Sequence, residues 1–262
     1  MRLGEIKQVR AEALGVNRKN IYHTNLQHLK DEALRANIVS AWLKHPSYGH
    51  KRLGLNLKVN HKRVRRVMKK FGLKVPRRKV FFYTTKSTQK VHKYTNLIKD
   101  FVPIHAHDLW CSDLSYFKYQ GKLFYLATIE DIFTRQVLSF NVGIKHDSVL
   151  VLKTIQEAIL NTKKLPTIFH SDQGNEFMAQ VCTEYLEEQA TQISVSDKAS
   201  PWQNGYQESF FGHFKDEIGD LNRFETIGEL IEAVYQQIYY YNHERIHTAL
   251  KMPPTVYAKQ LS

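Results

Sequence analysis

Residues 107–142 read HDLWCSDLSYFKYQGKLFYLATIEDIFTRQVLSFNV, and this stretch decides the fold class. Three of its segments are rich in β-branched and aromatic residues: His107–Tyr119, Leu123–Ile132 and Gln136–Val142. The turn-like sequences between them are short enough for hairpin connections. The stretch therefore predicts three consecutive antiparallel strands.

Helices and strands alternate after this point. The pattern predicts, in order, a helix over Ser148–Leu160, a strand over Thr167–Ser171, a helix around Phe177–Gln189, a strand over Gln192–Val195 and, at the end, a helix over Thr226–Tyr241. Before that last helix, Ser200-Pro201 reads as an N-cap followed by proline at the first helical position, and this helix should run past Lys215. Together these elements predict an α/β fold, a mixed sheet flanked by helices.

The chain before residue 80 has a helical pattern. It predicts one helix over Asp31–His45 and another over Asn60–Phe71, with Asn60 as N-cap and Gly72 as the C-terminal glycine. The second helix has an inward apolar stripe, and its other positions are basic: Lys62, Arg63, Arg65, Arg66, Lys69 and Lys70. We expect these six residues to contact DNA. A solvated helix face is the alternative, which the lack of interleaved glutamates weakens.

A short helical run, Arg52–Leu57, precedes this basic helix and follows the turn-like Tyr48-Gly49. The arrangement predicts a helix-turn-helix at about residues 46–73 whose second helix is the basic one. The expected domain organisation is therefore a basic helical DNA-binding region over 1–80, a linker over 81–104 and an α/β core over 105–262.

Charge is distributed unevenly along the 262 residues, whose formal net charge is +13. Residues 1–100 contain 25 basic and five acidic residues, whereas residues 101–262 contain 13 basic and 20 acidic ones. No acidic residue occurs between Glu32 and Asp100. A like-charge block of this size is typical of a polyanion-binding region, so we expect the first hundred residues to bind nucleic acid.

Composition excludes several other classes of protein. Hydrophobic residues make up 42% of the chain and charged residues 24%, as in a folded globular protein. Two cysteines, Cys111 and Cys182, are too few for a disulfide framework or a four-thiolate zinc site. The sequence has neither a membrane-length apolar run nor a signal-peptide pattern, so we expect a cytoplasmic protein with no membrane partner.

Three acidic residues occupy informative positions on this scaffold. Asp113 lies in the first predicted strand, Asp172 directly follows the fourth, and Glu208 lies in the helix that Ser200 begins, with 58 and 35 residues between them. Phosphodiester chemistry with two divalent ions needs several hard oxygen ligands that converge on one point. Taken singly, each acid is equally well explained as a turn or surface residue.

Short motifs around these acids make the sequence recognisable. They are WCSDLSY (110–116), HSDQGNEF (170–177), and SPWQNG (200–205) followed by ESFF (208–211). Together they resemble the catalytic core of DDE transposases and retroviral-type integrases, most of all the OrfB transposases of the IS-three family of bacterial insertion sequences. The 35-residue spacing, Lys215 seven residues after Glu208, and YGHKR (48–52) in the basic region also match that family.

The resemblance implies a ribonuclease H-like fold and a transposase that cleaves DNA at insertion-sequence ends and transfers the strands. It implies that Asp113, Asp172 and Glu208 are the catalytic residues and the ligands of two divalent ions, Mg²⁺ or Mn²⁺. Lys215, close to two helical turns after Glu208, shares its helix face and is expected to hold a DNA phosphate. The implied partners are double-stranded DNA, further copies of the chain on that DNA, and an upstream-frame DNA-binding segment. The implied location is the bacterial nucleoid.

Other interpretations remain open from the sequence. The main alternative function is a catalytically inactive DNA-binding remnant or regulator of transposition, and a general ribonuclease H-like nuclease is another. A tyrosine recombinase is disfavoured because residues 101–262 contain only three arginines. A retroviral integrase with its zinc module is disfavoured because two scattered cysteines cannot supply one. His170 is interpreted as a satisfied core histidine and Cys111 as a small core residue.

Overall fold

The computed structural model describes residues 9–15, 26–75, 93–197 and 205–261. It divides into two compact units, Met1–Lys74 and Val75–Ser262. Each unit is described separately below. The predicted helix start at Ser200-Pro201 lies outside the described residues.

Among the described residues of the first unit, 26–75 contain the helices α3 (Leu26–Lys44), α4 (His50–Asn56) and α5 (His61–Lys70), and residues 9–13 are also helical. The side chain of Asn60 caps α5 by accepting a hydrogen bond from the Lys62 amide at 2.9 Å, as the sequence predicts. Gly54 permits the close turn between α4 and α5, because a Cβ there would lie 2.9 Å from the Val59 carbonyl oxygen. α3, α4 and α5 all contribute buried apolar residues, namely Leu34, Ile38, Leu53, Val64 and Val67, and Tyr48 before α4 is buried as well.

A buried aspartate joins α3 to α5. The Asp31 carboxylate accepts hydrogen bonds from Arg66 at 2.5 and 2.8 Å and from Lys70 at 2.9 Å. These two cations hold the pKa of Asp31 well below its usual range, and Arg66 has the larger effect. Two of the six basic residues expected to contact DNA are thus already paired with an acid of the same unit. The sequence pattern of α5 alone could not show this, because their acidic partner lies on another helix.

The second unit is built on a five-stranded mixed sheet. Its strands are β1 (Leu109–Tyr119), β2 (Lys122–Asp131), β3 (Val137–Gly143), β4 (Ile168–Ser171) and β5 (Gln192–Val195), in the spatial order β3-β2-β1-β4-β5. The first three are antiparallel neighbours, as predicted, whereas β4 and β5 run parallel to β1. This order places β1 in the middle of the sheet, between β2 and β4.

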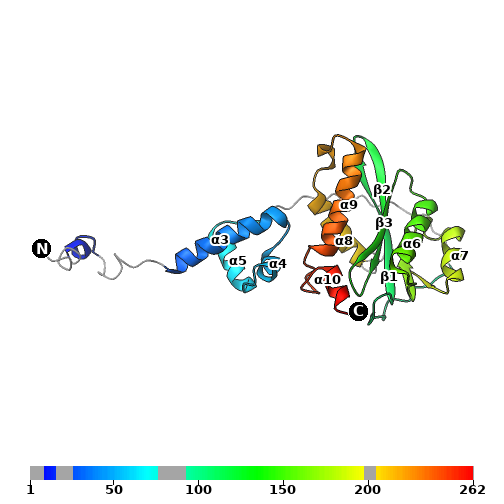
Figure 1. Ribbon diagram of the computed structural model, residues 1–262, viewed down its shortest axis with the longest axis horizontal. Helices are drawn as coiled ribbons and strands as arrows, with labels where there is room; N and C mark the ends of the chain where they lie inside the picture. The colour runs from blue at the N-terminus through cyan, green and yellow to red at the C-terminus, as the bar shows by residue number, and fades with distance from the viewer. Residues whose placement is uncertain (1–8, 16–25, 76–92, 198–204, 262) are drawn as a thin grey trace. The chain divides into compact units, whose positions relative to one another are not determined.

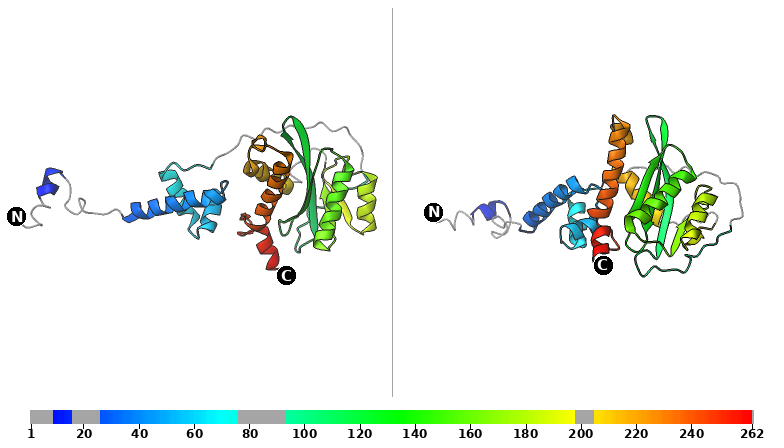
Figure 2. Two further views of the ribbon diagram at one scale, coloured as in Figure 1. Left: turned by 45° about the horizontal axis from the view of Figure 1, so that its top comes forward. Right: turned by 45° about the vertical axis from the view of Figure 1, so that its right-hand side comes forward.

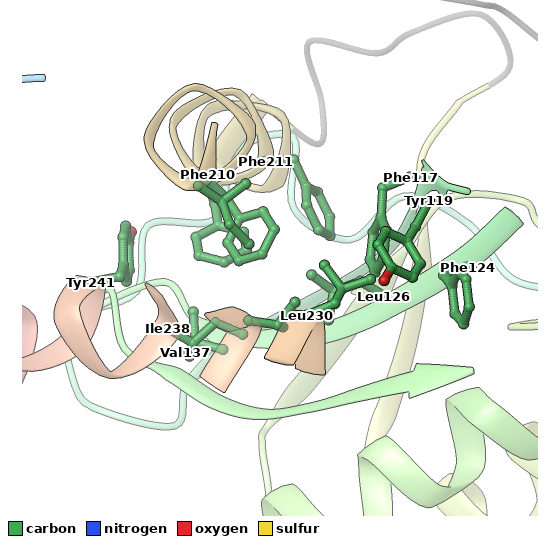
Figure 3. Close-up of a cluster of buried hydrophobic side chains, with 13 residues drawn as sticks. Phe117, Tyr119, Phe124, Leu126, Val137, Phe210, Phe211, Leu230, Ile238 and Tyr241 are labelled. Carbon is green, nitrogen blue, oxygen red and sulfur yellow. The ribbon is translucent and has the colours of Figure 1, made fainter. Parts of the chain in front are cut away.

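Helices cover both faces of the sheet (Figures 1 and 2). α6 (Ser148–Thr162) and α7 (Gln180–Glu188) lie on one face, and α8 (Gly205–Ile218) and α9 (Ile227–His243) on the other. On the α8–α9 face, aromatic residues from the strands and the helices form one apolar cluster, with Phe210 and Phe211 directed toward the sheet (Figure 3). Trp110, Ile129 and Ile155 belong to a second cluster, which joins the opposite face to α6 and α7. The predicted fold class, a mixed α/β sheet flanked by helices after a small helical region, is confirmed.

The structure departs from the sequence-based boundaries in a few places. α7 begins at Gln180 because residues 174–179 form turns, and two short elements were not predicted, a 3-10 helix at Leu221–Arg223 and α10 (Pro254–Lys259). Residues 93–104, the described part of the expected linker, lie on the second unit, where Ile98 and Phe101 pack against a small apolar cluster. In the described residues, no helix is long and apolar enough to cross a membrane.

Candidate active site

Asp113 occupies the central strand β1 on the face that α8 covers. Its cross-strand neighbour on β2 is Thr128, and its Oδ1 accepts a hydrogen bond from the Leu114 amide at 2.8 Å. The neighbouring pair Cys111 and His170 aligns β1 with the parallel strand β4. Because two more residues along each strand lead to Asp113 and Asp172, the register brings these two aspartates to the same level of the sheet.

Asp172 follows β4 in a tight turn. Its Oδ1 accepts a hydrogen bond from the Gly174 amide at 2.9 Å. A Cβ on Gly174 would lie 2.9 Å from the same oxygen and 2.5 Å from the Glu176 Oε1. A side chain at this position would therefore displace the carboxylates of Asp172 and Glu176 from where they lie.

Glu208 is on the first turn of α8, next to a residue that fixes this helix to the sheet. The buried Gln207 donates a hydrogen bond to the Cys111 carbonyl at 2.6 Å and accepts one from the Thr128 hydroxyl at 3.0 Å. Both contacts lie beside Asp113 along the two strands. Gln207 thus positions the start of α8 over β1 and leaves the side chain of Glu208 exposed.

The electrostatics of Asp113 show that the three acids share one neighbourhood. Burial first, and then the charges of Asp172 and Glu208, raise the pKa of Asp113 to about 7, against the lowering effect of the Leu114 hydrogen bond. Burial also raises the pKa of Asp172. Lys215 is the one cation that lowers the pKa of Asp113, and burial lowers its own pKa. The carboxylates repel one another, which is the environment that a bound cation would relieve.

The donor chemistry of this neighbourhood fits hard divalent cations. Carboxylate oxygens, here from a central strand, the end of the next strand and a helix, are the ligands that Mg²⁺ and Mn²⁺ prefer. In the described parts of the chain, no three His, Cys, Asp or Glu side chains are gathered closely enough to form a finished metal site. The structure therefore shows neighbouring acids that a cation would have to draw together.

Glu176, four residues after Asp172, also lies beside it, since the carboxylates of both flank Gly174. Its Oε1 is 3.1 Å from the His146 Nε2. Glu217, near the end of α8, is buried in an ion pair with Arg245 at 2.7 Å. Only the register and the turn around Gly174 reveal the closeness of Glu176, since its spacing in the chain matches many ordinary turns.

The remaining predicted residues have clear positions. His170 is buried with both ring nitrogens hydrogen-bonded, to Ser194 at 2.9 Å and Ser196 at 3.0 Å, which confirms its interpretation as a satisfied core histidine. Cys111 is buried in the core, as expected. In the first unit, the six basic positions of α5 are all exposed at residue level, and Arg66 and Lys70 are the ones paired with Asp31.

A mixed sheet that carries one acid within its central strand, a second at the end of the neighbouring strand and a third on the covering helix defines the class of integrase-type cores. Sequence profiles agree: the Integrase core domain matches residues 104–201, a second Integrase core domain profile matches residues 189–254, and an HTH-like domain matches residues 28–81. Among solved structures, the catalytic core of HTLV-2 integrase in complex with magnesium has a TM-score of 0.50 at 18% identity, over 59% of this chain and 98% of that one.

Relatives in sequence identify the family. A transposase-like protein of Haemophilus influenzae is 33% identical over 78% of this chain and 95% of its own length. Transposase InsK of the Escherichia coli insertion sequence element IS150 is 31% identical over 81% of this chain and 78% of its own length. The chain belongs to the insertion-sequence transposases with an integrase core. Their function is transposition through DNA cleavage and strand transfer, and the predicted ribonuclease H-like fold is confirmed.

Proposed function

We propose that this chain cleaves DNA at the ends of its own insertion sequence and joins them to target DNA, with Asp113, Asp172 and Glu208 as its catalytic carboxylates. The observation that supports this most is the environment of Asp113. It lies half-buried in the central strand, and the charges around it are mainly those of the other two acids. A protein gains no stability from such an arrangement, so a cation-dependent role explains it best.

The three carboxylates would hold two divalent ions, Mg²⁺ or Mn²⁺. When bound, such ions supply Lewis-acid chemistry that activates an attacking oxygen and stabilises the charge on a leaving oxygen. Asp113 would contribute ligand oxygens from within β1 and Asp172 from the end of β4, and Glu208 would contribute from a helix that Gln207 holds in place. Lys215 lies on the Glu208 face of α8, where its ammonium group would bind a DNA phosphate next to the carboxylates.

DNA binding by the first unit completes the proposal. Lys62, Arg63, Arg65 and Lys69 are exposed on α5 and would contact phosphates, whereas Arg66 and Lys70 divide their charge between DNA and Asp31. We assign DNA binding to residues 1–80, connection to 81–104 and catalysis to 105–262. The proposed partners are double-stranded DNA, further copies of the chain bound to it and an upstream-frame segment. The proposed location is the bacterial cytoplasm, at the nucleoid.

The test uses two substitutions on the same helix. Glu208→Gln keeps size and polarity but removes one anionic ligand, whereas Asp216→Asn makes the same chemical change on an exposed position away from the Glu208 face. Each protein, supplied with any upstream segment it requires, is incubated with Mn²⁺ and duplex DNA that carries an end of the element. We expect Glu208→Gln to lose nicking and joining by on the order of 10²–10³-fold, as when one charge-stabilising group is removed.

DNA affinity of the same proteins is measured by gel shift. We expect it to be nearly unchanged in Glu208→Gln, and we expect Asp216→Asn to behave as wild type in both assays. Equal cleavage by wild type and Glu208→Gln would contradict the assignment of Glu208. A folded wild type that binds the ends and never nicks them would favour the inactive regulator.

A further inference from the structure

The sequence motif around Asp113, WCSDLSY, ends in a tyrosine that the proposed catalysis does not use. Tyr116 is 38% exposed, and its cross-strand neighbour on β2 is Tyr125. Residues directly opposite each other on antiparallel strands have side chains on the same face, with Cβ atoms about 4.5–5.5 Å apart. The Tyr125 ring in turn lies 5.2 Å from the ring of His146, measured between ring centres. Tyr116 therefore presents an exposed ring on a part of the sheet that its neighbours support.

Lys215 of α8 contacts this ring. Its Nζ lies 5.5 Å from the centre of the Tyr116 ring, within the distance at which an ammonium group is attracted to an aromatic face. Among the residues that the structure describes, Lys215 forms no hydrogen bond or ion pair. The ring of Tyr116 is therefore the described group that restrains the ammonium.

The edge of β1 brings this ring close to the catalytic carboxylates. β1 pairs with β4 only from Leu109 to Cys111, and beyond that point no described strand pairs with β1 on this side. Asp113 and Tyr116 are three residues apart, so their side chains leave the strand on opposite faces. Lys215 spans the open edge between them, because its charge lowers the pKa of Asp113 while its ammonium lies over the ring.

The contact with the ring also affects which partner the ammonium takes. A lysine next to several acids is attracted to their carboxylates. Lys215 lies over Tyr116 instead, and in the described structure it forms no ion pair with Asp113. This arrangement leaves the carboxylate oxygens available to a cation and the three N–H donors of the ammonium available to an anion. A DNA phosphate at the carboxylates is an anion with the matching charge.

We propose that Tyr116 is a positioning residue for Lys215, whose ammonium its ring holds at the edge of β1 to bind one DNA phosphate beside the catalytic carboxylates. The proposal rests on the proposed function, which assigns a phosphate contact to Lys215. Ordering a lysine side chain on binding costs free energy, and a ring that already restricts the side chain reduces this cost. The Tyr116 hydroxyl, which has no hydrogen bond within the described residues, is not required.

Neutral phosphates placed one at a time in the DNA test this coupling. Duplexes that carry an end of the element are made with a single methylphosphonate, an uncharged phosphate analogue, at each position near the cleavage site. Affinities are measured by gel shift without divalent ions, so that no strand is cut, and each protein is supplied with any upstream segment it requires. We expect one position to weaken wild-type binding about tenfold through the loss of a charged hydrogen bond to Lys215.

Five variants are compared with wild type. Lys215→Met removes the ammonium, Tyr116→Leu and Tyr116→Thr remove the ring, and Tyr116→Phe keeps the ring without the hydroxyl. The matched control is Lys118→Met, which removes an exposed lysine from the same face of β1 as Tyr116.

At the position that reports Lys215, Lys215→Met should bind intact DNA about tenfold more weakly than wild type and should lose nothing further from the methylphosphonate. Tyr116→Leu and Tyr116→Thr should bind intact DNA about threefold more weakly, because the lysine must now be ordered on binding. The methylphosphonate should then cost these two variants only about threefold. Tyr116→Phe and Lys118→Met should lose about tenfold at this position, as wild type does.

A tenfold methylphosphonate loss that persists in Tyr116→Leu and Tyr116→Thr would overturn the proposal, whatever their affinity for intact DNA. A merely structural effect of Tyr116 has this result, because it weakens binding to both duplexes equally. A Tyr116→Phe protein that responds as Tyr116→Leu does would also overturn it. If Lys215→Met keeps the wild-type response at every position, the phosphate contact itself is wrong. Failure of the catalytic assignment is distinct, since it would show as cleavage that does not depend on Glu208.

Discussion

Each unit of this chain has an aspartate in a structurally central place, and the charges around these two aspartates differ in sign: they are positive around Asp31 and mainly negative around Asp113. In the first unit, Asp31 is fully buried and accepts hydrogen bonds from Arg66 and Lys70, so its pKa is lowered. In the second unit, the loss of solvent around Asp113 and the charges of Asp172 and Glu208 raise the pKa of Asp113 to about 7. The first arrangement stabilises its own fold. The cluster of acids around Asp113 does not stabilise the fold unless a cation is bound. This difference distinguishes a structural acid from a catalytic one.

Neutralising Asp113 gives the largest expected effect on function. Asp113→Asn should lower DNA cleavage by about 10³-fold or more, since it removes a central ligand oxygen and one charge needed for cation binding. Without metal, the melting temperature of Asp113→Asn should be no lower than that of wild type, because the substitution also removes repulsion among the acids. Thermal melting and a nicking assay on the same preparation check both parts. Wild-type cleavage by this variant would contradict the catalytic role of Asp113.

The corresponding aspartate-to-asparagine change in the first unit should instead lower the stability of that unit. Asp31→Asn leaves Arg66 and Lys70 without a buried counter-charge, so we expect the first unit to melt roughly 5 °C or more below wild type. Hydrogen exchange of peptides from α3 and α5 reports this unit directly. Glu32→Gln, an exposed neighbour on the same helix, is the matched control and should melt as wild type. Equal melting of all three proteins would show that the ion pairs contribute nothing.

Changing pH should separate the two units further. Because Asp113 has a pKa raised from 3.8 to about 7, the metal-free folded core holds more protons than the unfolded chain between these values. Its contribution therefore makes the core more stable as pH falls from 8 to 5. The lowered pKa of Asp31 has the reverse sign, so its stabilising effect is present above pH 4 and is lost as the solution becomes more acidic.

Urea unfolding followed by hydrogen exchange measures both trends. Asp113→Asn should remove part of the gain in core stability between pH 8 and pH 5, and should leave the α3 and α5 peptides unchanged. An identical pH profile for wild type and this variant would show that the pKa of Asp113 is not raised in the folded protein.

The smallest expected effect distinguishes the two kinds of cation on α5. Arg65→Ala with Lys69→Ala should flatten the dependence of log K on log[salt] by up to about 2, since each lost phosphate contact removes about 0.9. The same change should leave melting almost unaltered. Arg66→Ala with Lys70→Ala should instead lower the melting temperature, because Asp31 loses its partners. Equal melting and equal salt slopes for the two double variants would remove the distinction.

Much of this architecture could be predicted because it depends on local patterns. The strands from Leu109 to Gly143 follow from their composition, and α5 follows from the Asn60 cap and its apolar stripe. The pairing of Asp31 with Arg66 could not be predicted, because the partners are 35 residues apart and on different helices. The burial of Glu130 could not be predicted for a similar reason, because only the tertiary fold encloses it.

Metal-directed cleavage of the protein itself tests the catalytic assignment most directly. Fe²⁺ takes the place of Mg²⁺ or Mn²⁺ at oxygen-rich sites, and with ascorbate and peroxide it generates radicals that cut the nearby backbone. Mass spectrometry of the fragments then locates the site without requiring DNA or activity. We predict cuts near residues 113, 172 and 208 together, suppressed by excess Mg²⁺ and absent in Asp113→Asn. Cuts confined to other parts of the chain, or a pattern that Asp113→Asn leaves unchanged, would contradict a metal site at these three carboxylates.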